Sequence, residues 1–434
     1  MTSTTAIDDV TCLGCGCACD DVRVVVEAGR IVGVQNECAL GAGWFGDSEV
    51  PSRITVDGRD ATLDDAIAAA STRLRAAARP LVYLGLSISC EAQRAGVAVA
   101  DILRARVDSV TSATTLPLVL AAQERGFASS TLGEIRNRAD VVVFWGVDVE
   151  RRYPRFASRY VPEPIGTHVP DGRRGRRVIA IDVGAAQSTV ADVDHRFTVP
   201  PAAELAVLTA LQALARESSS IRAIPPDADA PWPVARAIAA HLLSGRYVAL
   251  VFDAEPDERA VRSPQRFDAI LALSQALNER TRGAAVGLRA GGNRSGADSV
   301  FTAHTGFPVR VDFERGIPRF DPYGGSTRAT DVALVIGDAS LIPRPVADTL
   351  AGVQLVVIGP RASESPLGSA TVTIDTGVAG IHSAGTAFRV DDVPLSLRAP
   401  LRDRLSAADV ISSLARHVAM ARRQTSRTER ASAR

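Results

Sequence analysis

The sequence predicts an α/β protein that begins with a small cysteine-rich domain. Short apolar runs rich in β-branched residues alternate with amphipathic stretches, a pattern typical of parallel sheets covered by helices on both faces. The runs are too short for buried helices. Five of the six cysteines fall in the first tenth of the chain, which indicates a separate metal-binding domain there.

Composition narrows the classes of protein to consider. The chain has 434 residues, enough for two or three domains, and its 46% hydrophobic content excludes a largely disordered protein. Its 49 basic and 49 acidic residues balance, so we expect neither nucleic acid nor an anionic membrane as a partner. No apolar stretch approaches a membrane span of about 20 residues, and the first residues lack the features of a secretory signal. We therefore expect a cytoplasmic protein.

Cys12, Cys15, Cys19 and Cys38 are the expected metal ligands. Their spacing, C-x-x-C-x-x-x-C with a fourth cysteine further on, suits an iron–sulfur cluster of the [4Fe–4S] type or tetrahedral zinc, whereas disulfides are unusual in the reducing cytosol. We expect the cluster ahead of zinc, with an empty site as the third alternative. Cys17 is expected to be a spare and Cys90 a small buried residue.

The first elements follow from local patterns. Two β-branched runs, 22–27 and 30–34, flank Ala28 and Gly29 and predict a hairpin that returns Cys38 toward the other cysteines. Residues 1–55 thus form the predicted cysteine-rich domain, which is too small to be stable on apolar burial alone and would depend on its metal. A capping box at 62–65 then predicts a helix that continues to Arg79 and is stopped by Pro80.

The remaining chain is predicted to form two α/β domains at 56–216 and 234–421, joined by a polar linker at 217–233. Their strands are the apolar runs 81–86, 141–146, 178–182, 248–253, 332–337, 355–359 and 372–374. The Pro/Gly-rich segment 161–177 is predicted to be an exposed loop, and the basic tail 422–434 to be frayed.

Several catalytic motifs are missing from the sequence. The six histidines are scattered, with no spacing suited to a hydrolytic zinc centre, so hydrolysis by a metal would need another chain. There is no phosphate-binding P-loop motif and no nucleophile elbow. The glycine-rich turn 291–296 is compatible with a phosphate contact and equally with an ordinary tight loop.

The chain resembles the B subunit of formylmethanofuran dehydrogenase, a branch of the molybdopterin oxidoreductases, nearly from end to end. The motifs that carry the resemblance are the cysteine segment from Cys12 to Asp21 with Cys38, Arg138 to Gly146, Tyr153 to Tyr160, Asn293-Arg-Ser-Gly296, Thr305-Gly-Phe-Pro308, Asp312 to Gly316, and Gly385 to Asp391. The resemblance implies nested Rossmann-like, doubly wound α/β domains after the cysteine-rich domain. It also implies a [4Fe–4S] cluster beside a tungsten- or molybdenum-pterin that interconverts carbon dioxide and formylmethanofuran.

The chain departs from this family at the redox centre. Where the redox members carry a Cys-His-Gly-Pro segment whose thiolate binds the metal, this chain has Thr114 and Thr115, and a threonine hydroxyl does not replace a soft thiolate. The family's Trp-Gly-x-Asn-Pro ends here in Asp148-Val149, and a carboxylate there would repel a pterin phosphate.

Of two other active-site positions of the family, one is lost in this chain and one is kept. The glutamate expected after Asp321 is absent from the segment 323–326, whereas Arg289 matches an active-site arginine of the family. We therefore expect no catalytic residue and no bound tungsten- or molybdenum-pterin. Gly146, Asp148, Arg289, Asn293 and Gly296 are then weak or vestigial cofactor-binding positions.

The resemblance also suggests a role for a subunit of this family that lacks the redox centre. Methylotrophic bacteria have a formyltransferase/hydrolase complex built from relatives of these subunits, which moves formyl groups from tetrahydromethanopterin to a methanofuran-like carrier and releases formate. This sequence fits its non-redox B subunit, with amidohydrolase-type and formyltransferase subunits as partners. Two alternatives remain: an active dehydrogenase in which Thr114, another oxygen ligand or water completes the metal shell, and a metal-binding scaffold unrelated to one-carbon transfer.

Overall fold

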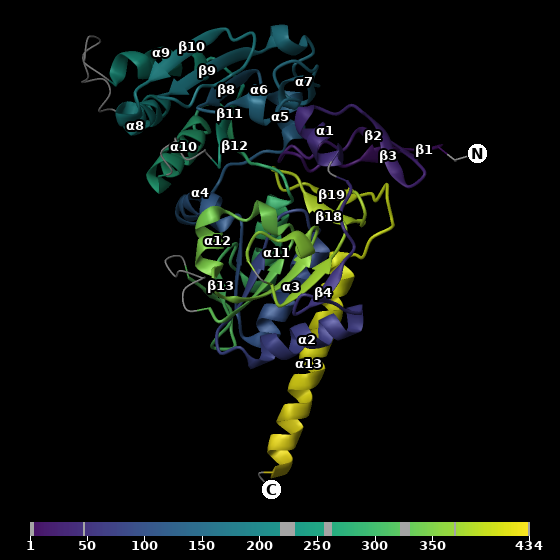
Figure 1. The fold of residues 1–434 in the computed structure, drawn as a ribbon. Coiled ribbons are helices and arrows are strands. Elements are labelled where there is room, and N and C mark those ends of the chain that lie inside the picture. Colours follow the sequence, from purple (N-terminus) through teal and green to yellow (C-terminus); the bar gives the residue numbers. More distant parts are fainter. Residues whose placement is uncertain are drawn as a thin grey trace. The chain divides into compact units, whose positions relative to one another are not determined.

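The computed structural model describes residues 4–46, 48–217, 231–255, 263–321, 330–368 and 370–432, with the backbone alone after residue 421. The chain forms two compact units, Met1–Ala113 with Gly291–Arg434 (unit 1) and Thr114–Ala290 (unit 2) (Figure 1). Unit 2 is inserted into the sequence of unit 1, whereas the sequence analysis placed the domains one after another. Most of the expected linker, 218–230, lies outside the described residues.

Unit 1 is built on a nine-stranded sheet with the order β14-β13-β7-β6-β15-β16-β17-β4-β5. Strands β7, β6, β15, β16 and β17 run parallel to their neighbours in this series. The strands are β4 (Ile54–Val56), β5 (Arg59–Asp60), β6 (Pro80–Leu84), β7 (Arg106–Ser109), β13 (Val311–Asp312), β14 (Arg319–Phe320), β15 (Val332–Ile336), β16 (Gln354–Gly359) and β17 (Val372–Asp375). Because β6 precedes unit 2 in the sequence and β15 follows it, their pairing makes unit 1 discontinuous.

Helices cover both faces of this sheet. On one face, Val82 and Leu84 of β6 pack with α2 (Leu63–Ala76), α3 (Cys90–Leu103), α11 (Arg294–Thr305) and α13 (Ala407–Ser432). On the other face, Leu81 and Tyr83 pack with α12 (Arg344–Leu350). Adjacent residues of β6 are thus buried on opposite sides, which explains why the strand is apolar throughout. The predicted α/β class is confirmed.

Helix α2 begins as predicted and ends earlier than predicted. Thr62 caps it, its Oγ1 accepting a hydrogen bond from the Asp65 N–H at 3.2 Å. The helix ends at Ala76, so its predicted continuation to Arg79 is wrong, and Pro80 is the first residue of β6. The Asp331 carboxylate accepts hydrogen bonds from the N–H groups of Ala78 (2.6 Å) and Arg79 (2.9 Å), which hold the chain in its path into β6.

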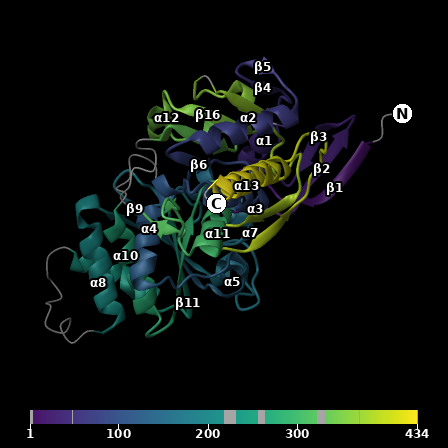
Figure 2. The same cartoon turned by 90° about the horizontal axis from the view of Figure 1, so that it is seen from below.

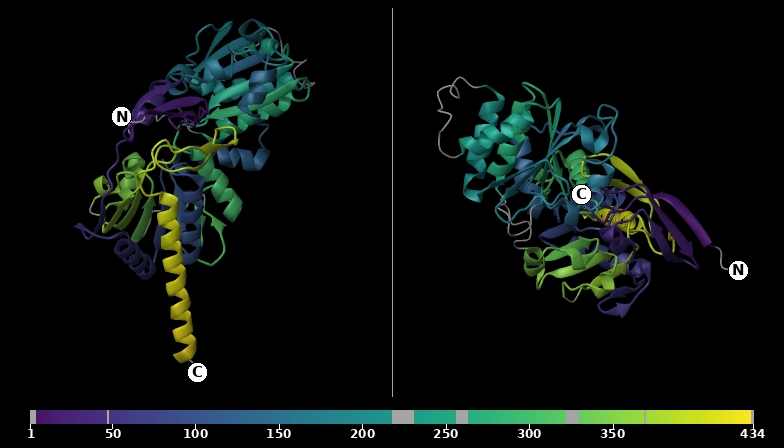
Figure 3. Two further views of the ribbon diagram at one scale, coloured as in Figure 1. Left: turned by 90° about the vertical axis from the view of Figure 1, so that its right-hand side faces the viewer. Right: turned by 90° about the horizontal axis from the view of Figure 1, so that it is seen from above.

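The predicted N-terminal hairpin is confirmed. Strands β2 (Val22–Glu27) and β3 (Arg30–Gln35) pair antiparallel, and β1 (Thr4–Val10) pairs with β2 on its other side to form a three-stranded sheet, purple in Figure 3. Helix α1 (Ala39–Gly46) follows the hairpin. A second hairpin, β18 (Gly385–Phe388) with β19 (Pro394–Leu397), contributes Ala387 and Leu397 to the apolar cluster that contains Leu13 of the cysteine segment.

Unit 2 contains a five-stranded, wholly parallel sheet with the order β10-β9-β8-β11-β12. The strands are β8 (Val141–Trp145), β9 (Arg177–Val183), β10 (His195–Val199), β11 (Tyr247–Asp253) and β12 (Arg282–Leu288). Its helices include α4 (Ser112–Arg125), α5 (Leu132–Arg138), α8 (Glu204–Ala215), α9 (Trp232–Leu242) and α10 (Pro264–Leu277). The order reverses between β8 and β11, and in open parallel sheets such a reversal opens a crevice at the carboxyl ends of the strands.

The segment 161–177 is not simply an exposed loop as predicted. Arg176 is buried, and its guanidinium donates hydrogen bonds to four carbonyl oxygens, those of Arg136 (2.6 Å), Ala139 (3.1 Å), Pro162 (2.8 Å) and Pro164 (2.5 Å). Two of these carbonyls lie at the carboxyl end of α5, where a cation is favoured. The arginine-rich composition predicts a solvated loop, but the Arg176 side chain ties this segment to α5.

Two stacked histidines predict a pH dependence of unit 2. The rings of His195 and His241 lie 3.8 Å apart between centroids. Burial, together with His195 and Arg177 nearby, lowers the pKa of His241 below the ordinary value of 6.5. The unfolded chain then binds protons more readily, so stability from this site is complete above about pH 6.5 and falls as the pH drops through it.

This pH dependence can be measured by urea unfolding of the full chain at pH 7.5 and 5.5. We expect the free energy of unfolding to be lower at pH 5.5, and the His241→Gln variant to lose less than the wild type does. The matched control is His304→Gln, at a histidine on α11 of unit 1. If the free energy of unfolding fell by the same amount between pH 7.5 and 5.5 in the wild type and in His241→Gln, this expectation would be contradicted.

The C-terminal tail, predicted to be frayed, is helical. Helix α13 lies along α3 (Figure 2) and continues through Ser432. Among the described residues, no helix combines the length and apolar character needed to cross a membrane.

Candidate functional site

The cysteine segment of unit 1 forms a compact loop beside α1. The Cys12 N–H donates to the Cys19 carbonyl at 2.8 Å, and the Ala18 N–H donates to that of Cys15 at 3.1 Å, which folds residues 12–19 back on themselves. Cys38 comes immediately before α1. The helix approaches Cys12 closely, because a methyl group added at Gly41 would lie 3.5 Å from the Cys12 Sγ.

The four expected ligands therefore lie in one corner of unit 1. Burial raises the pKa of the Cys12 thiol, and proximity to Cys15, Cys19 and Cys38 raises it further. Four thiols are the donor set of a [4Fe–4S] cluster or a structural zinc ion. However, in the part of the chain that the structure describes, no three Cys, His, Asp or Glu side chains are grouped as in a metal site. The donor chemistry fits a metal, but a preformed metal geometry is not shown.

Backbone contacts with the rest of unit 1 hold this loop in place. The Gly292 N–H donates to the Leu13 carbonyl at 3.0 Å, and the Val390 N–H donates to that of Gly16 at 2.9 Å. Any side chain at Gly291 would collide with the loop, because an added Cβ would lie 2.0 Å from the Leu13 oxygen. The glycine-rich turn 291–296 therefore has a packing role, and the loop does not depend on a metal alone for its position.

Asn293 and Gly296, expected to be weak cofactor positions, lie inside unit 1. Asn293 is buried, its Nδ2 donates to the Ile88 carbonyl at 3.0 Å, and its Oδ1 accepts from the Phe388 N–H at 3.0 Å. An added Cβ at Gly296 would lie 2.1 Å from this Oδ1. Buried Cys90, in agreement with the prediction, packs here with its Sγ 3.6 Å from the Asn293 Nδ2. The Asn-Arg-Ser-Gly motif thus joins α3, α11 and β18.

This arrangement predicts that Asn293→Ala destabilises the chain by about 2–4 kcal/mol, because one buried and one partly buried backbone group lose their hydrogen-bond partner. Asn36→Ala is a matched control, since both asparagines have left-handed backbones, with φ of 61° and 62°, but Asn36 is exposed. The free energies of unfolding of both variants are compared by urea titration. Equal losses would show that the Asn293 side chain does not hold the fold together.

Gly146 follows β8 at the reversal of the unit 2 sheet. It has φ of +57°, and a Cβ there would lie 3.2 Å from the Arg266 Nη2. Both Arg266 (Nε) and Trp145 (Nε1) donate to the buried Glu204 carboxylate, at 2.9 and 2.7 Å. The Trp-Gly pair is therefore held by a buried network of the chain itself.

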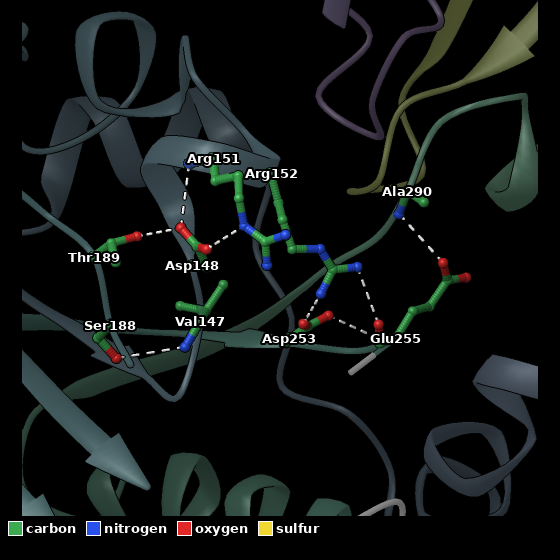
Figure 4. Close-up of polar contacts among 9 residues, drawn as sticks. All are labelled: Val147, Asp148, Arg151, Arg152, Ser188, Thr189, Asp253, Glu255 and Ala290. Carbon is green, nitrogen blue, oxygen red and sulfur yellow. Dashed lines mark hydrogen bonds and ion pairs between the residues drawn. The ribbon is translucent and has the colours of Figure 1, made fainter. Parts of the chain in front are cut away.

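Asp148 caps the short helix α6 (Val149–Arg152) (Figure 4). Its carboxylate accepts hydrogen bonds from Thr189 and from the Arg151 N–H (3.2 Å) and Nε (2.6 Å). Partial burial opposes ionisation, but these hydrogen bonds outweigh it and lower the pKa of Asp148 below its usual value. The carboxylate is therefore ionised at neutral pH and already engaged within unit 2.

The end of β11 carries two further acids that the sequence analysis missed. Arg152 pairs with the buried Asp253 and donates to the Glu255 carbonyl at 3.0 Å (Figure 4). The buried Glu255 carboxylate accepts from the Arg289 Nε and the Ala290 N–H, both at 3.2 Å. Asp253 is the last residue of a buried apolar strand at the sheet reversal and Glu255 comes two residues later, and that position was the available signal.

Arg289, expected to match an active-site arginine of the resembled family, links Glu255 to Thr115. Its Nη2 donates to the Thr115 Oγ1 at 3.2 Å. Thr115 is buried in α4, and Thr114 beside it is half-buried. Beside Thr114, the position expected to match the family's metal ligand, the Thr115 hydroxyl is thus hydrogen-bonded to an arginine that pairs with a carboxylate. Three carboxylates, those of Asp148, Asp253 and Glu255, lie at the reversal, and each is paired with an arginine of the chain itself.

Two known proteins are similar to the chain over most of its length. No protein-family model matches the chain. The B subunit of tungsten-containing formylmethanofuran dehydrogenase 2 from Methanococcus maripaludis is 29% identical over 437 residues, which cover 94% of this chain and 98% of the relative. The protein of the same name from Methanocaldococcus jannaschii is 29% identical over 417 residues, covering 90% and 93%.

A solved structure shares the fold. A chain of the crystal structure of the formyltransferase/hydrolase complex (FhcABCD) from Methylorubrum extorquens, in complex with methylofuran, matches with a TM-score of 0.70 at 23% sequence identity. The match covers 84% of this chain and 98% of that chain.

Proposed function

We propose a function on the premise that this chain is a homologue of the formylmethanofuran dehydrogenase B subunit, a resemblance that the two curated relatives confirm. The chain acts as the non-redox B subunit of a formyltransferase/hydrolase complex in one-carbon metabolism linked to tetrahydromethanopterin. It serves as the structural partner of amidohydrolase-type and formyltransferase subunits, and a methanofuran-like carrier reaches it through the complex.

One observation carries the proposal: the arrangement of Thr115, Arg289 and Glu255. In a redox member of the family, a thiolate at the position of Thr114 would bind tungsten or molybdenum, and an arginine nearby would be available to the substrate or cofactor. Here the position offers only hydroxyls, and the Arg289 charge is balanced by buried Glu255. A hydroxyl is a hard ligand that does not replace a thiolate. The residues present do not fit the pterin centre.

The test is an activity measurement on the complex with its partner subunits. We expect formyl transfer and formate release without any electron acceptor. We also expect no reduction of a viologen dye when formylated carrier is supplied. Viologen reduction linked to formyl oxidation would overturn the proposal. It would favour the second candidate, a redox-active dehydrogenase subunit, which the similarity to tungsten-containing relatives and the retained Arg289 support.

The cysteine corner would hold a metal as a structural element. Cys12, Cys15, Cys19 and Cys38 are the residues that would bind a [4Fe–4S] cluster, whose chemistry when bound is one-electron transfer. Because the loop is also anchored through Leu13 and Gly16, we expect Cys12→Ala to lose metal while the chain stays folded.

Iron and acid-labile sulfide assays on anaerobically purified protein test this expectation, together with circular dichroism. Cys90→Ala is the control for loss of a buried thiol outside the corner. Zinc without iron would contradict the cluster, and unfolding of Cys12→Ala alone would contradict the anchoring role of the backbone contacts.

A further inference from the structure

The N-terminal sheet of unit 1 ends in an uncovered strand. In the order β1-β2-β3, only β2 pairs with β3, so one backbone edge of Arg30–Gln35 has no strand beside it among the described residues. A strand edge of this kind offers a row of N–H and C=O groups to another chain.

A groove of about 950 Å³ runs along this edge. Every residue from 28 to 34 lines it. Consecutive side chains of a strand point to opposite faces, so a hollow touched by all of them lies along the edge and not over one face. The opposite wall comes from the end of α1, which packs beside β3 (Figure 1), and from the segments 48–51, 361–364 and 401–404. We call this hollow the β3 groove.

The strand lacks the features that normally protect an edge. Its centre is the apolar run Ile31-Val32-Gly33-Val34, without proline or a charged side chain, and Val32 is 56% exposed. Natural edge strands usually carry charges, prolines or covering segments that prevent pairing with other chains. An apolar edge inside a groove is therefore suited to a specific added strand.

The charges of the groove indicate what kind of strand fits. Arg404 pairs with Asp403 at 2.5 Å, and Arg361 donates to the Glu49 carbonyl at 2.9 Å. Glu37 and Glu364 are exposed and form no ion pair with any residue that the structure describes. The groove is lined by four acidic side chains, Glu37, Glu49, Glu364 and Asp403, and by three arginines, Arg30, Arg361 and Arg404, and this excess of one negative charge favours a basic ligand.

We propose that the β3 groove binds an extended segment of a partner subunit, with alternating apolar and basic residues, by β-strand addition. Main-chain hydrogen bonds along β3 supply affinity, and Glu37 and Glu364 select basic side chains. The six residues of β3 would accommodate a strand of about six residues, roughly 20 Å long. That the segment comes from another chain of the complex rests on the proposed function, but the chemistry of the groove does not.

The test is amide hydrogen exchange on the full chain, alone, with its coexpressed partner subunits, and with a synthetic peptide, Thr-Arg-Val-Arg-Val-Arg-Val-Thr. We expect exchange across residues 28–36 to slow at least tenfold with the partners and with the peptide. Strand β1 is the internal control, because its outer edge should exchange unchanged. The peptide Thr-Glu-Val-Glu-Val-Glu-Val-Thr should give no protection.

Substitutions inside and outside the β3 groove test whether the peptide binds there. Glu37→Arg combined with Glu364→Arg should weaken peptide binding at least tenfold, as should Val32→Lys, whereas Glu314→Arg with Asp348→Arg, exposed acids outside the groove, should not. The proposal is overturned if neither partners nor basic peptide protect β3, or if protection rises with the concentration of the chain alone, which would show self-pairing. A complex that fails to form while the peptide still protects β3 would count against the proposed function only.

Discussion

Glu255→Leu should destabilise the chain by about 3–5 kcal/mol, because it removes the buried carboxylate that pairs with Arg289 and leaves a buried cation without it. The Ala290 N–H would lose its acceptor as well. Adding Arg289→Met should recover much of the loss, since replacing both members of a buried pair with apolar groups is far less costly than removing one.

This double-mutant cycle is measured by urea unfolding of the full chain. The matched control is Glu279→Leu, which breaks the exposed Arg216–Glu279 pair and should cost no more than about 1 kcal/mol. If Glu255→Leu behaves like Glu279→Leu, or if Arg289→Met gives no rescue, Glu255 does not neutralise Arg289. The arginine would then be available to an anionic ligand, as the redox alternative requires.

Arg176→Met should have an effect of similar size, about 3–5 kcal/mol, on the same urea titration. The substitution keeps much of the apolar volume but removes the donor of four carbonyl oxygens, two of which, those of Ala139 and Pro162, accept buried hydrogen bonds. Burial, and Arg136 nearby, lower the pKa of Arg176, but the four hydrogen bonds hold the guanidinium in place.

The control for Arg176 lies two residues away. Arg174→Met changes an exposed arginine of the same basic run and should alter stability by less than about 0.5 kcal/mol. If Arg176→Met and Arg174→Met lowered the free energy of unfolding by amounts within about 1 kcal/mol of each other, segment 161–177 would be held to α5 by other contacts.

The sequence was sufficient to predict the strands that are apolar on both faces. All seven predicted runs are strands, from β6 to β17, because burial on two sides leaves an unmistakable pattern. Strand β12 was missed because Arg282–Leu288 is rich in glycine and alanine, and β7 because its four residues include an arginine and an aspartate.

The division into units could not be predicted in the same way. It depends on the pairing of β6 with β15, whose residues are far apart in the sequence, and no local pattern records which distant strands meet. The predicted boundaries near 55 and 233 followed changes in composition, whereas the units divide where the chain leaves and re-enters the large sheet.

The residue types of the candidate site could be predicted from the sequence, but the side-chain contacts between them could not. The clustered cysteines and Thr114-Thr115 were evident as residue types, and the structure places the four cysteines in one corner. That Asn293 holds three elements together, or that Glu255 faces Arg289, depends on contacts across 34 residues or more. Such contacts show that these side chains hold parts of the fold together.

The most direct test of the central claim is the tungsten, molybdenum and pterin content of the purified complex, measured by elemental analysis and by fluorescence of the oxidised pterin. A non-redox role predicts that neither metal nor pterin is present above trace amounts, even when cells are grown with both metals. One equivalent of tungsten or molybdenum with stoichiometric pterin would contradict it and identify the chain as a redox subunit.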